Sequence, residues 1–550
     1  MRLSSQPQTI LGESAQLMPN RNHQVPSAAI LAFTCKTVTR ATVRVSDGVK
    51  RWRIEFGERQ PGPSELPLVG FRAGRTHVIG LELNDQAGNS QILGPFEFRS
   101  PDLPISETEF PTISVTRNIS ARLEPGITLF SLRRRNLMRA HWRNRAQFDF
   151  TRLFGMLVAI DSDGHVVWSY KGDARIAGVE MLANGNLMFH TTEFLTYEVN
   201  ILGETVRAFY AARRPQGPAA QAIPIDAASI HHQPHQKPDG NFLAMTANAR
   251  VIENYYTSET DPNAPRKTMS VVGDRIIEFT PDGREVWAWN AFDHLDTDRI
   301  GFNLLDPYWH TRGFPHHADW THGNGVTYDE RTDRVIVSLK HQDAILGINR
   351  ATGEIAWILG DHGGWPQRLQ NKLLSPIGNL RWPWHMHNPR ITHRGTIVLY
   401  DNGTVQARPF DKPKAPHETY SRAVEYSVDE ANMTVRQIWA SSDRLDSDSV
   451  SVWAMGDAHI LPKTQNALVM DSIIMEKRDD LQWNEWSRDW HPDDFPYRPR
   501  LREYATTNPP EVLWETWIEN PSDTMSWEVF GGLRTASLYV GTGIRWIDEP

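Results

Sequence analysis

Two histidines stand in matching positions ahead of short apolar segments, and a third precedes a similar segment. His232 and His387 are each followed eight residues later by a glycine, Gly240 or Gly395, that opens a strand-like run. His322 comes before the turn and the apolar run of THGNGVTYDERTDRVIVS. Imidazole nitrogens donate hydrogen bonds to oxyanions and also ligate metals. Three imidazoles converging on one point would therefore form a site for an anion or a metal ion.

Two further polar residues belong to the same stretch as His322. Asn324 follows it by two residues, and Lys340 ends the next apolar run. Amide and ammonium groups also donate hydrogen bonds to oxyanions, so we expect these side chains to surround one small tetrahedral anion. One histidine near a turn is more often structural. Two histidines at the same position of the repeat, with a third in a neighbouring repeat, favour a binding or catalytic site.

The other histidines near these positions are weaker candidates. Alternation along a strand predicts that His231 and His341 point away from the site. We expect His235 and His393 to lie on the surface, because they stand in turns. His385 lies two residues before His387 and can share its face, so it stays an outside candidate.

A recurring hairpin is the element that must position these residues. Each copy has an alternating apolar strand, a polar turn and a second strand with an aromatic residue, as expected of a β-hairpin. A short apolar strand precedes most copies, and we take this strand as the innermost one of a propeller blade. Six hairpins predict an all-β chain with a six-bladed β-propeller. Their aromatic residues are Trp168, Phe209, Trp287, Trp357, Trp439 and Trp514.

Strand-like runs at the two ends of the repeat have no hairpin of their own. GITLFSL begins at Gly126 and GGLRTASLYVG at Gly531. We expect them to pair and so close the ring. The first hundred residues alternate without the hairpin aromatic, which predicts a small N-terminal β-sandwich over 1–105, a proline-containing linker, and the catalytic propeller over 112–550.

Composition excludes several classes of protein. The chain has 550 residues and a formal charge of −8, with no long basic run, so nucleic acid is not an expected partner. No segment is apolar over the length of a membrane span, and the N-terminus lacks the apolar core of a secretory signal. Cys35 is the only cysteine, which excludes an intramolecular disulfide and a cysteine metal cluster. These features are typical of a cytoplasmic protein.

Several stretches resemble the bacterial arylsulfate sulfotransferases (ASST). MHNPRITHRGTIVLYDNG, from Met386, is similar to a motif of that family, and the residues from Asp319 to Trp365 resemble its longest characteristic stretch. The resemblance also covers HHQPHQKPDGNFLAM and GMLVAIDSDGHVVWSY, and extends to the N-terminal sandwich. It implies a six-bladed propeller that transfers a sulfuryl group from a phenolic sulfate to a phenol without PAPS, the nucleotide sulfate donor. It also implies a periplasmic location, which conflicts with the expectation from the N-terminus, where we find no secretory signal.

The resemblance assigns roles to the candidate residues. His387 stands where the family has its nucleophile, which implies a sulfohistidine intermediate and ping-pong kinetics. His232, His322 and Asn324 match positions that hold the sulfuryl oxygens, and either histidine can carry the proton. Lys340 replaces the family's usual arginine, which keeps the charge but loses the two-pronged guanidinium. The resemblance implies no cofactor, a phenolic sulfate donor and a phenol acceptor as partners, and a possible homodimer.

A phenol needs an aromatic wall, and two ring-rich segments precede the candidate histidines. Tyr308, Trp309 and Trp320 come before His322, and Trp382 and Trp384 come before His387. We expect these rings to frame the entrance, although packing between blades is an equally good use for any one of them. The ring-rich insertion around Trp483 is more typical of a loop or subunit contact.

Three other functions remain open from the sequence. The histidines could hold a metal ion in a metal-dependent propeller enzyme, although Lys340 beside them disfavours a cation and no carboxylate obviously completes the ligands. The protein could hydrolyse aryl sulfates instead of transferring the group. It could also be a non-catalytic propeller that serves as a binding platform.

Overall fold

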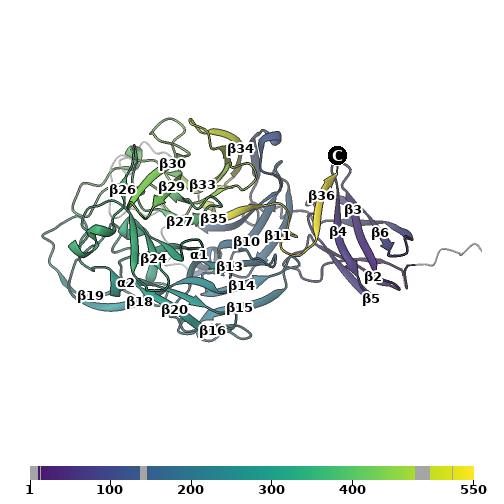
Figure 1. The fold of residues 1–550 in the computed structure, drawn as a ribbon, viewed down its shortest axis with the longest axis horizontal. Coiled ribbons are helices and arrows are strands. Elements are labelled where there is room, and N and C mark those ends of the chain that lie inside the picture. The colour runs from purple at the N-terminus through teal and green to yellow at the C-terminus, as the bar shows by residue number, and fades with distance from the viewer. Residues whose placement is uncertain (1–9, 13, 137–144, 477–495, 523, 550) are drawn as a thin grey trace, which may run out of the picture.

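Eight β-sheets hold nearly all the regular structure of the computed structural model, which describes residues 10–12, 14–136, 145–476, 496–522 and 524–549 (Figure 1). The helices among these residues are short, so the prediction of an all-β chain is confirmed. They are α1 (Arg145–Arg152), α2 (Ala291–His294) and the 3-10 helices η1 (Ser120–Arg122), η3 (Pro307–Trp309), η4 (Lys340–Gln342), η5 (Gln367–Lys372) and η6 (Pro416–Glu418).

Six of the sheets form a closed ring, because the first strand of each contacts the first strand of the next. Sheets arranged in this way around an axis are the blades of a β-propeller. We number the blades in ring order. Their innermost strands, from blade 1 to blade 6, are β35 (Met525–Thr535), β12 (Ile176–Met181), β17 (His231–Gln236), β22 (Gly323–Asp329), β27 (His387–Ile391) and β31 (Asp457–Ile460).

The remaining strands of each blade follow outwards from the axis, with a fifth strand at or near the outer edge of most blades. Blade 1 continues with β9 (Ile127–Asn136), β10 (Gly155–Ile160) and β11 (Val166–Gly172); blade 2 with β13 (Leu187–Thr191), β14 (Leu195–Val199), β15 (Thr205–Ala211) and β16 (Ile223–Ile225); blade 3 with β18 (Phe242–Tyr255), β19 (Lys267–Phe279), β20 (Glu285–Asn290) and β21 (Ala318–Asp319). Blade 4 continues with β23 (Arg334–Leu339), β24 (Ala344–Asn349) and β25 (Ile355–Gly360); blade 5 with β28 (Ile397–Asp401), β29 (Arg422–Asp429), β30 (Thr434–Ala440) and β26 (Ser375–Pro376); blade 6 with β32 (Ala467–Met475), β33 (Tyr497–Ala505), β34 (Glu511–Ile518) and β8 (Ile113–Asn118).

The six predicted hairpins are the third and fourth strands of the blades. Three of their tryptophans, Trp168, Trp357 and Trp514, are hydrogen-bonded to the next blade. The indole N–H of Trp168 in blade 1 donates to the carbonyl of Ile201 in blade 2, at 2.9 Å. Trp514 in blade 6 donates to Ser162 in blade 1, at 2.9 Å. A buried indole needs such an acceptor, which explains the recurrence of tryptophan at this position.

The expected innermost strands are second in their blades. The strands that we took as innermost are β13, β18, β23, β28 and β32, and each pairs with one further strand on its axial side. The sequence concealed these axial strands, because they are short and those of blades 2 to 5 break register within a few residues. His232 and His387 therefore lie on innermost strands and not in loops ahead of them.

The ring closes in blade 1 as predicted. β35, near the C-terminal end of the chain, pairs antiparallel with β9 from Met525↔Asn136 to Thr535↔Ile127. β8 adds a second closing contact, because it pairs with β34 at the outer edge of blade 6. Segments far apart in the sequence thus complete two neighbouring blades.

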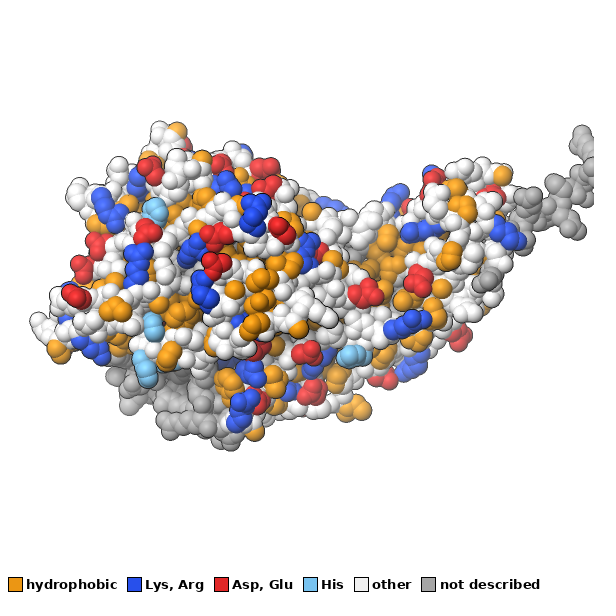
Figure 2. All heavy atoms as spheres, turned by 90° about the horizontal axis from the view of Figure 1, so that it is seen from below, with side chains coloured by type: hydrophobic (Ala, Val, Ile, Leu, Met, Phe, Trp, Pro, Cys, Tyr) orange, Lys and Arg blue, Asp and Glu red, His pale blue; other side chains and the backbone are white. Residues whose placement is uncertain are grey.

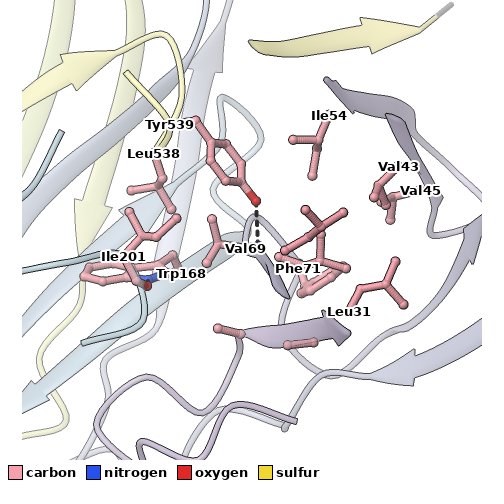
Figure 3. Packing of buried hydrophobic residues seen from close by; sticks show 14 of the residues in the cluster. Leu31, Val43, Val45, Ile54, Val69, Phe71, Trp168, Ile201, Leu538 and Tyr539 are labelled. Atoms are coloured by element: carbon pink, nitrogen blue, oxygen red, sulfur yellow. Dashed lines mark hydrogen bonds between the residues drawn. The ribbon is translucent and has the colours of Figure 1, made fainter. Parts of the chain in front are cut away.

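The N-terminal region folds into two sheets that share one core. The strands are β1 (Gln16–Pro19), β2 (Ala29–Cys35) and β5 (Gly62–Leu68) in one sheet, and β4 (Arg51–Arg59), β3 (Thr39–Ser46), β6 (Thr76–Asp85) and β7 (Ser90–Arg99) in the other. β3 alternates between buried and exposed residues, since only one of its faces meets the core. Leu31, Val43 and Ile54 from both sheets lie in this core (Figure 3).

The N-terminal region and the propeller also share buried residues. Trp168 and Ile201 belong to the same apolar cluster as Val69 and Phe71 (Figure 3). The hydroxyl of Tyr539 accepts a hydrogen bond from the backbone N–H of Val69, at 3.0 Å. A strand from the C-terminal end, β36 (Arg545–Glu549), pairs with β4 (Figure 1). The division at 105 and 112 stays a prediction, but these last residues join the N-terminal sheet.

The surface has no feature of a nucleic-acid binder on the face shown in Figure 2, where acidic and basic side chains are interspersed. None of the helices in the described ranges has the length and apolar character that a membrane-spanning helix requires. The insertion around Trp483 lies outside the described residues.

Candidate active site

Three consecutive blades bring the predicted histidines together. His232 lies on β17, His322 directly precedes β22, and His387 begins β27. The ring centre of His232 is 5.7 Å from that of His387 and 6.0 Å from that of His322. All three are buried, with at most 8% of each residue exposed, and all three line one cavity of about 510 Å³. The predicted convergence is therefore present in the structure.

A glycine sets the close approach of blades 4 and 5. Gly325 packs directly against the backbone of β27, so that a β-carbon added there would lie 2.6 Å from Cα of Asn388 and 2.5 Å from Cδ of Pro389. These distances are too short for any side chain. The glycine thus lets the strand that follows His322 lie against the strand that carries His387.

Strained backbone marks two of the three histidines. His232 has φ +59° and His322 has φ +44°, in the left-handed region that residues with a side chain seldom adopt. Such conformations cost about 1–3 kcal/mol each and are concentrated at functional sites. Here they turn both imidazoles from the strand direction into the cavity.

The hydrogen bonding of His387 fixes the protonation of its ring. Nδ1 lies 2.7 Å from the carbonyl oxygen of Gly456, and since a carbonyl only accepts, Nδ1 carries the hydrogen. Nε2 is buried and has no hydrogen-bond partner among the described residues. Burial lowers the pKa of His387 to about 4, and the nearby carboxylate of Asp457 only partly offsets this. At neutral pH the ring is therefore uncharged, and Nε2 bears a free lone pair.

His322 is paired with a carboxylate instead. Its Nδ1 is hydrogen-bonded to Asp319, which is fully buried. The ring of His341 stacks on the ring of His322, with a distance of 4.6 Å between the ring centres. Nδ1 of His341 donates a hydrogen bond to the backbone carbonyl of Asp319, at 2.8 Å. A carboxylate at Nδ1 orients the imidazole and keeps a hydrogen on that nitrogen, which leaves Nε2 of His322 as the nitrogen that can give and take a proton.

His232 is linked to a neighbour that we expected to point away. Nδ1 of His231 lies 2.9 Å from Nδ1 of His232, and Nε2 of His231 lies 3.2 Å from the carboxylate of Asp274. His231 also lines the cavity, so the prediction from strand alternation was wrong. The reason is the left-handed backbone at His232 and the register shift in β17. Burial and the surrounding imidazoles hold the pKa of His232 well below 6.5.

Asn324 and Lys340 also line the cavity. One amide hydrogen of Asn324 goes to the carbonyl of Met386, at 2.7 Å, and its oxygen accepts from Ser338, at 2.5 Å. The amide has a second hydrogen for a ligand. Lys340 is 6% exposed, and its ammonium has no hydrogen bond or ion pair among the described residues. Burial lowers the pKa of Lys340 below its usual value, although three acidic side chains act against this.

The aromatic wall differs from the predicted one. Tyr308 lines the cavity, with its ring centre 4.7 Å from that of His322. Trp309 and Trp320 are buried behind the wall, and Trp382 and Trp384 do not line it either, so these four expectations were wrong. Phe530, from the closing strand β35, takes that place instead, with its ring centre 5.2 Å from that of His387.

The four other candidate histidines, His235, His341, His385 and His393, do not line the cavity. His385 is buried and hydrogen-bonded through Nδ1 to Thr404, at 2.9 Å, so it does not share the face of His387. His341 does not reach the cavity but supports His322 from behind. His393 is exposed, as predicted, whereas His235 is half-buried beside Glu180.

The sequence of this chain is similar to that of proteins in a known family. The family model of the arylsulfotransferases (ASST) matches residues 136–483 of the chain, which is more than half its length. The chain belongs to the arylsulfotransferase family. It is 26% identical over 258 residues to the arylsulfate sulfotransferase AssT of Escherichia coli O6:H1, covering 40% of this chain and 41% of the relative. It is 28% identical over 210 residues to AssT of Lelliottia amnigena, covering 30% and 34%. The chain thus matches less than half the length of each relative.

Solved structures resemble this chain only distantly. The β-propeller domain of Cps50 (Swd1) from Myceliophteria thermophila is 9% identical, with a TM-score of 0.32, over 74% of this chain and 100% of that one. BamB from Moraxella catarrhalis is 11% identical, with a TM-score of 0.26, over 66% and 91%. These similarities are too low to carry an inference.

One part of the cavity was missed from the sequence. Arg133, Arg175 and Glu528 are buried charged residues that line it. The run of three arginines from Arg133 to Arg135, directly after the strand-like run GITLFSL, was a usable signal, because a strand that continues through it has arginine on both faces.

Asp319, His322 and His341 have ligand atoms within 4.8 Å of one another, which suits a metal ion by distance. Nδ1 of both imidazoles is already hydrogen-bonded to Asp319, through its carboxylate or its backbone carbonyl. The ammonium of Lys340 in the same cavity opposes a cation. The existing bonds and charges at this cluster therefore favour an anion.

Proposed function

We propose that the protein is an arylsulfate sulfotransferase, which moves a sulfuryl group from a phenolic sulfate ester to a phenol through a sulfohistidine on His387. The observation that carries the proposal is the buried Nε2 of His387, held as a free lone pair by the hydrogen bond from Nδ1 to Gly456. Membership of the arylsulfotransferase family supports the same reaction class.

In the first half-reaction Nε2 of His387 attacks the sulfur of the aryl sulfate. The N–S bond forms, the S–O bond to the aromatic ring breaks, and the phenolic oxygen leaves with its electron pair. A neutral nucleophile suits this step, because a sulfate monoester is an anion and repels an anionic one. The lowered pKa of His387 keeps it neutral at physiological pH.

The transferred oxygens need hydrogen-bond donors that are already in place. Lys340 supplies an ammonium, and Asn324 supplies its remaining amide hydrogen. His232 lies close enough to His387 to contact the same group. Donors fixed in a water-poor site can lower the barrier by about 2.7–4 kcal/mol each. Donors held by the folded chain also require no rearrangement during the reaction.

His322 is the better of the two candidates for proton transfer. Asp319 holds its Nδ1 by a hydrogen bond, so Nε2 is the nitrogen that can protonate the departing phenolic oxygen. In the second half-reaction the acceptor phenol returns a proton to Nε2 of His322 and attacks the sulfur. The N–S bond breaks, and its electron pair returns to His387. His232 lacks a direct carboxylate partner and faces other imidazoles, which suits a donor to the sulfuryl oxygens better.

Trapping the intermediate tests this function. The protein is mixed briefly with 4-nitrophenyl sulfate without a phenol, quenched at alkaline pH, and weighed by intact-mass spectrometry. We expect the addition of one sulfuryl group, located on His387 by peptide mapping, and its loss when phenol is added. The exposed His393→Ala variant should still be labelled, and His387→Ala should not. Absence of label under burst conditions contradicts the proposal.

The same assay separates two alternatives. An aryl sulfate hydrolase would release nitrophenol at a rate that phenol does not change, and would form no phenyl sulfate. A metal-dependent enzyme, for which the cluster of Asp319, His322 and His341 is the candidate site, would contain one metal ion per chain by elemental analysis. We expect transfer to a phenol, and activity that persists after treatment with a chelator.

A further inference from the structure

Two arginines share one carboxylate in the wall of the active-site cavity. Glu528 lies on β35 directly opposite Arg133 on β9, and its Oε2 is 3.0 Å from Nη2 of Arg133. Arg175, just before β12, is ion-paired with the same oxygen. The side chains of Arg133 and Arg175 are each 7% exposed, and that of Glu528 is 1% exposed. The proposed reaction assigns none of these three residues a role.

The charges of this cluster do not balance. Arg133 and Arg175 together carry two positive charges against the one carboxylate of Glu528, with which Arg135 also pairs, at 2.9 Å. Neither Arg133 nor Arg175 has another acidic partner among the described residues, and Nε of Arg133 is buried without a hydrogen bond. Burial and the neighbouring Arg175 lower the pKa of Arg133 to about 9. Positive charge that is buried beyond its counter-charge is costly unless an anion joins it.

The cluster lies one aromatic side chain away from the proposed nucleophile. Cζ of Arg133 is 4.9 Å from the ring centre of Phe530, and the ring centre of His387 is 5.2 Å from the same point. Glu528 and Phe530 are two residues apart on β35, so both face the cavity. A ligand with one benzene ring packed against Phe530 therefore has His387 at one end and the arginines within reach of the other.

We propose that Arg133 and Arg175 form a second anion subsite, which selects phenols carrying an additional anionic group, such as a carboxylate, on the ring position remote from the hydroxyl. This inference rests on the proposed function, because it names the substrate class of the same cavity. Guanidinium groups bind carboxylates through paired, charge-assisted hydrogen bonds, which are among the strongest in proteins. The sulfuryl oxygens would bind to Lys340 and Asn324, which leaves Arg133 and Arg175 to bind the additional anionic group of the phenol.

Two acceptors of equal size test the subsite. 4-Hydroxybenzoate and 4-hydroxybenzamide differ in charge but hardly in shape, and kcat/KM is measured for each with 4-nitrophenyl sulfate as donor. We expect the wild-type protein to prefer the carboxylate by about tenfold or more, as charge-assisted bonds of this kind imply. A ratio near one in the wild-type protein overturns the proposal.

Variants then locate the preference. Arg175→Gln should lower the ratio of the two kcat/KM values at least fivefold, and Arg175→Lys should retain most of it because the charge remains. Arg152→Gln is the matched control, since Arg152 lines the same cavity but pairs with Glu193. It removes the same charge and should leave the ratio within twofold. An equal fall in Arg152→Gln would mean that the whole cavity's charge is responsible, which also overturns the subsite.

Binding without turnover separates the two proposals. Titration calorimetry with the wild-type protein and no donor compares the affinities of 4-hydroxybenzoate and 4-hydroxybenzamide. Tighter binding of the carboxylate, weakened by added salt, supports the subsite even if no phenol accepts a sulfuryl group. Transfer to phenols without any preference in binding supports the proposed function and overturns the subsite. The wild-type comparison needs no variant, so it stands even if Arg175→Gln does not fold.

Discussion

Nδ1 of His387 lies 2.7 Å from the carbonyl oxygen of Gly456, and this one contact decides what the other ring nitrogen can do. A backbone carbonyl accepts and cannot donate, so the hydrogen must be on Nδ1 and the lone pair on Nε2. Gly456 lies just ahead of β31 in blade 6, and His387 begins β27 in blade 5. The tautomer of the proposed nucleophile is thus set by the packing of two neighbouring blades.

The lowered pKa of His387 predicts an unusual acid limit of activity. Its pKa in the folded protein is about 4, below the ordinary value of 6.5, and only the neutral ring can attack sulfur. The donor's kcat/KM should therefore stay level from pH 7 down to about pH 5 and fall as the pH approaches 4. The measurement is a pH profile with 4-nitrophenyl sulfate, which stays an anion throughout. An acid limb centred near 6.5 would show that His387 is not the titrating nucleophile.

The same shift has a consequence for stability. A histidine whose pKa is lowered by folding costs no stability above pH 6.5, but the free energy of unfolding falls as the pH drops from about 6.5 to about 4, because the unfolded chain binds the proton first. Acid unfolding and loss of activity must therefore be separated, by recording circular dichroism at each pH of the profile. A fall in kcat/KM with an unchanged spectrum assigns the titration to the site.

Much of the fold could be predicted, but the innermost strands could not. The hairpins, such as β24–β25 with Trp357, show the alternation and turns that sequence patterns report well. β17 does not, because His232 has left-handed backbone and the strand shifts register. The convergence of His232, His322 and His387 could be predicted, because these histidines stand at similar positions ahead of the repeated apolar strands. The contribution of His231 was not, since alternation assumes an extended strand.

Contacts made by chain closure were also beyond sequence reasoning. Glu528 and Phe530 enter the cavity because β35 pairs with β9, although nearly four hundred residues separate them in the sequence. Pairing of the two terminal runs was predicted, but not the register that places Glu528 opposite Arg133. A shift of one residue would have turned both side chains to the other face.

Loss of His322 should depend on the leaving group. In the proposed reaction His322 protonates the departing phenolic oxygen, so His322→Gln should slow transfer from phenyl sulfate ~10²–10⁴-fold. Nitrophenolate leaves well without a proton, so the loss with 4-nitrophenyl sulfate should be at least tenfold smaller. The measurement is kcat/KM for a series of aryl sulfates. Asp319→Asn should steepen the same dependence in the same direction, because the carboxylate no longer keeps the hydrogen on Nδ1 of His322.

An equal loss for every donor would contradict a role of His322 in proton transfer. It would assign the residue to holding the sulfuryl oxygens, and His232 would then become the candidate for the proton. Repeating the series with His232→Gln provides the comparison, since we expect its losses to be independent of the leaving group.

Lys340 should be needed for its charge. Lys340→Gln removes the ammonium that faces the sulfuryl oxygens and should lower the donor's kcat/KM ~10²–10³-fold, as for the loss of one fixed donor in a water-poor site. Lys340→Arg keeps the charge and should lower kcat/KM by less than tenfold. Steady-state kinetics with 4-nitrophenyl sulfate provides the measurement. Equal activity of Lys340→Gln and the wild-type protein would remove Lys340 from the site.

Gly325 should be intolerant of a single methyl group. In Gly325→Ala the new β-carbon would meet Pro389 and Asn388 at 2.5–2.6 Å, which forces β22 away from β27. Overpacking of this kind costs ~1–3 kcal/mol of stability, and it separates His322 and Asn324 from His387. We expect a lower unfolding temperature together with a fall in kcat that persists at temperatures where the variant is folded.

Gly80→Ala is the matched control for Gly325→Ala. Gly80 also lies within a strand, but the nearest atom to an added β-carbon is 4.0 Å away, and its backbone is not left-handed. It lies in the N-terminal sheets, so both the unfolding temperature and kcat should stay close to the wild-type values. If Gly325→Ala kept wild-type kcat while losing stability, the spacing of blades 4 and 5 would matter for folding alone. The geometry of His322 and His387 would then tolerate more movement than the proposed proton transfer allows.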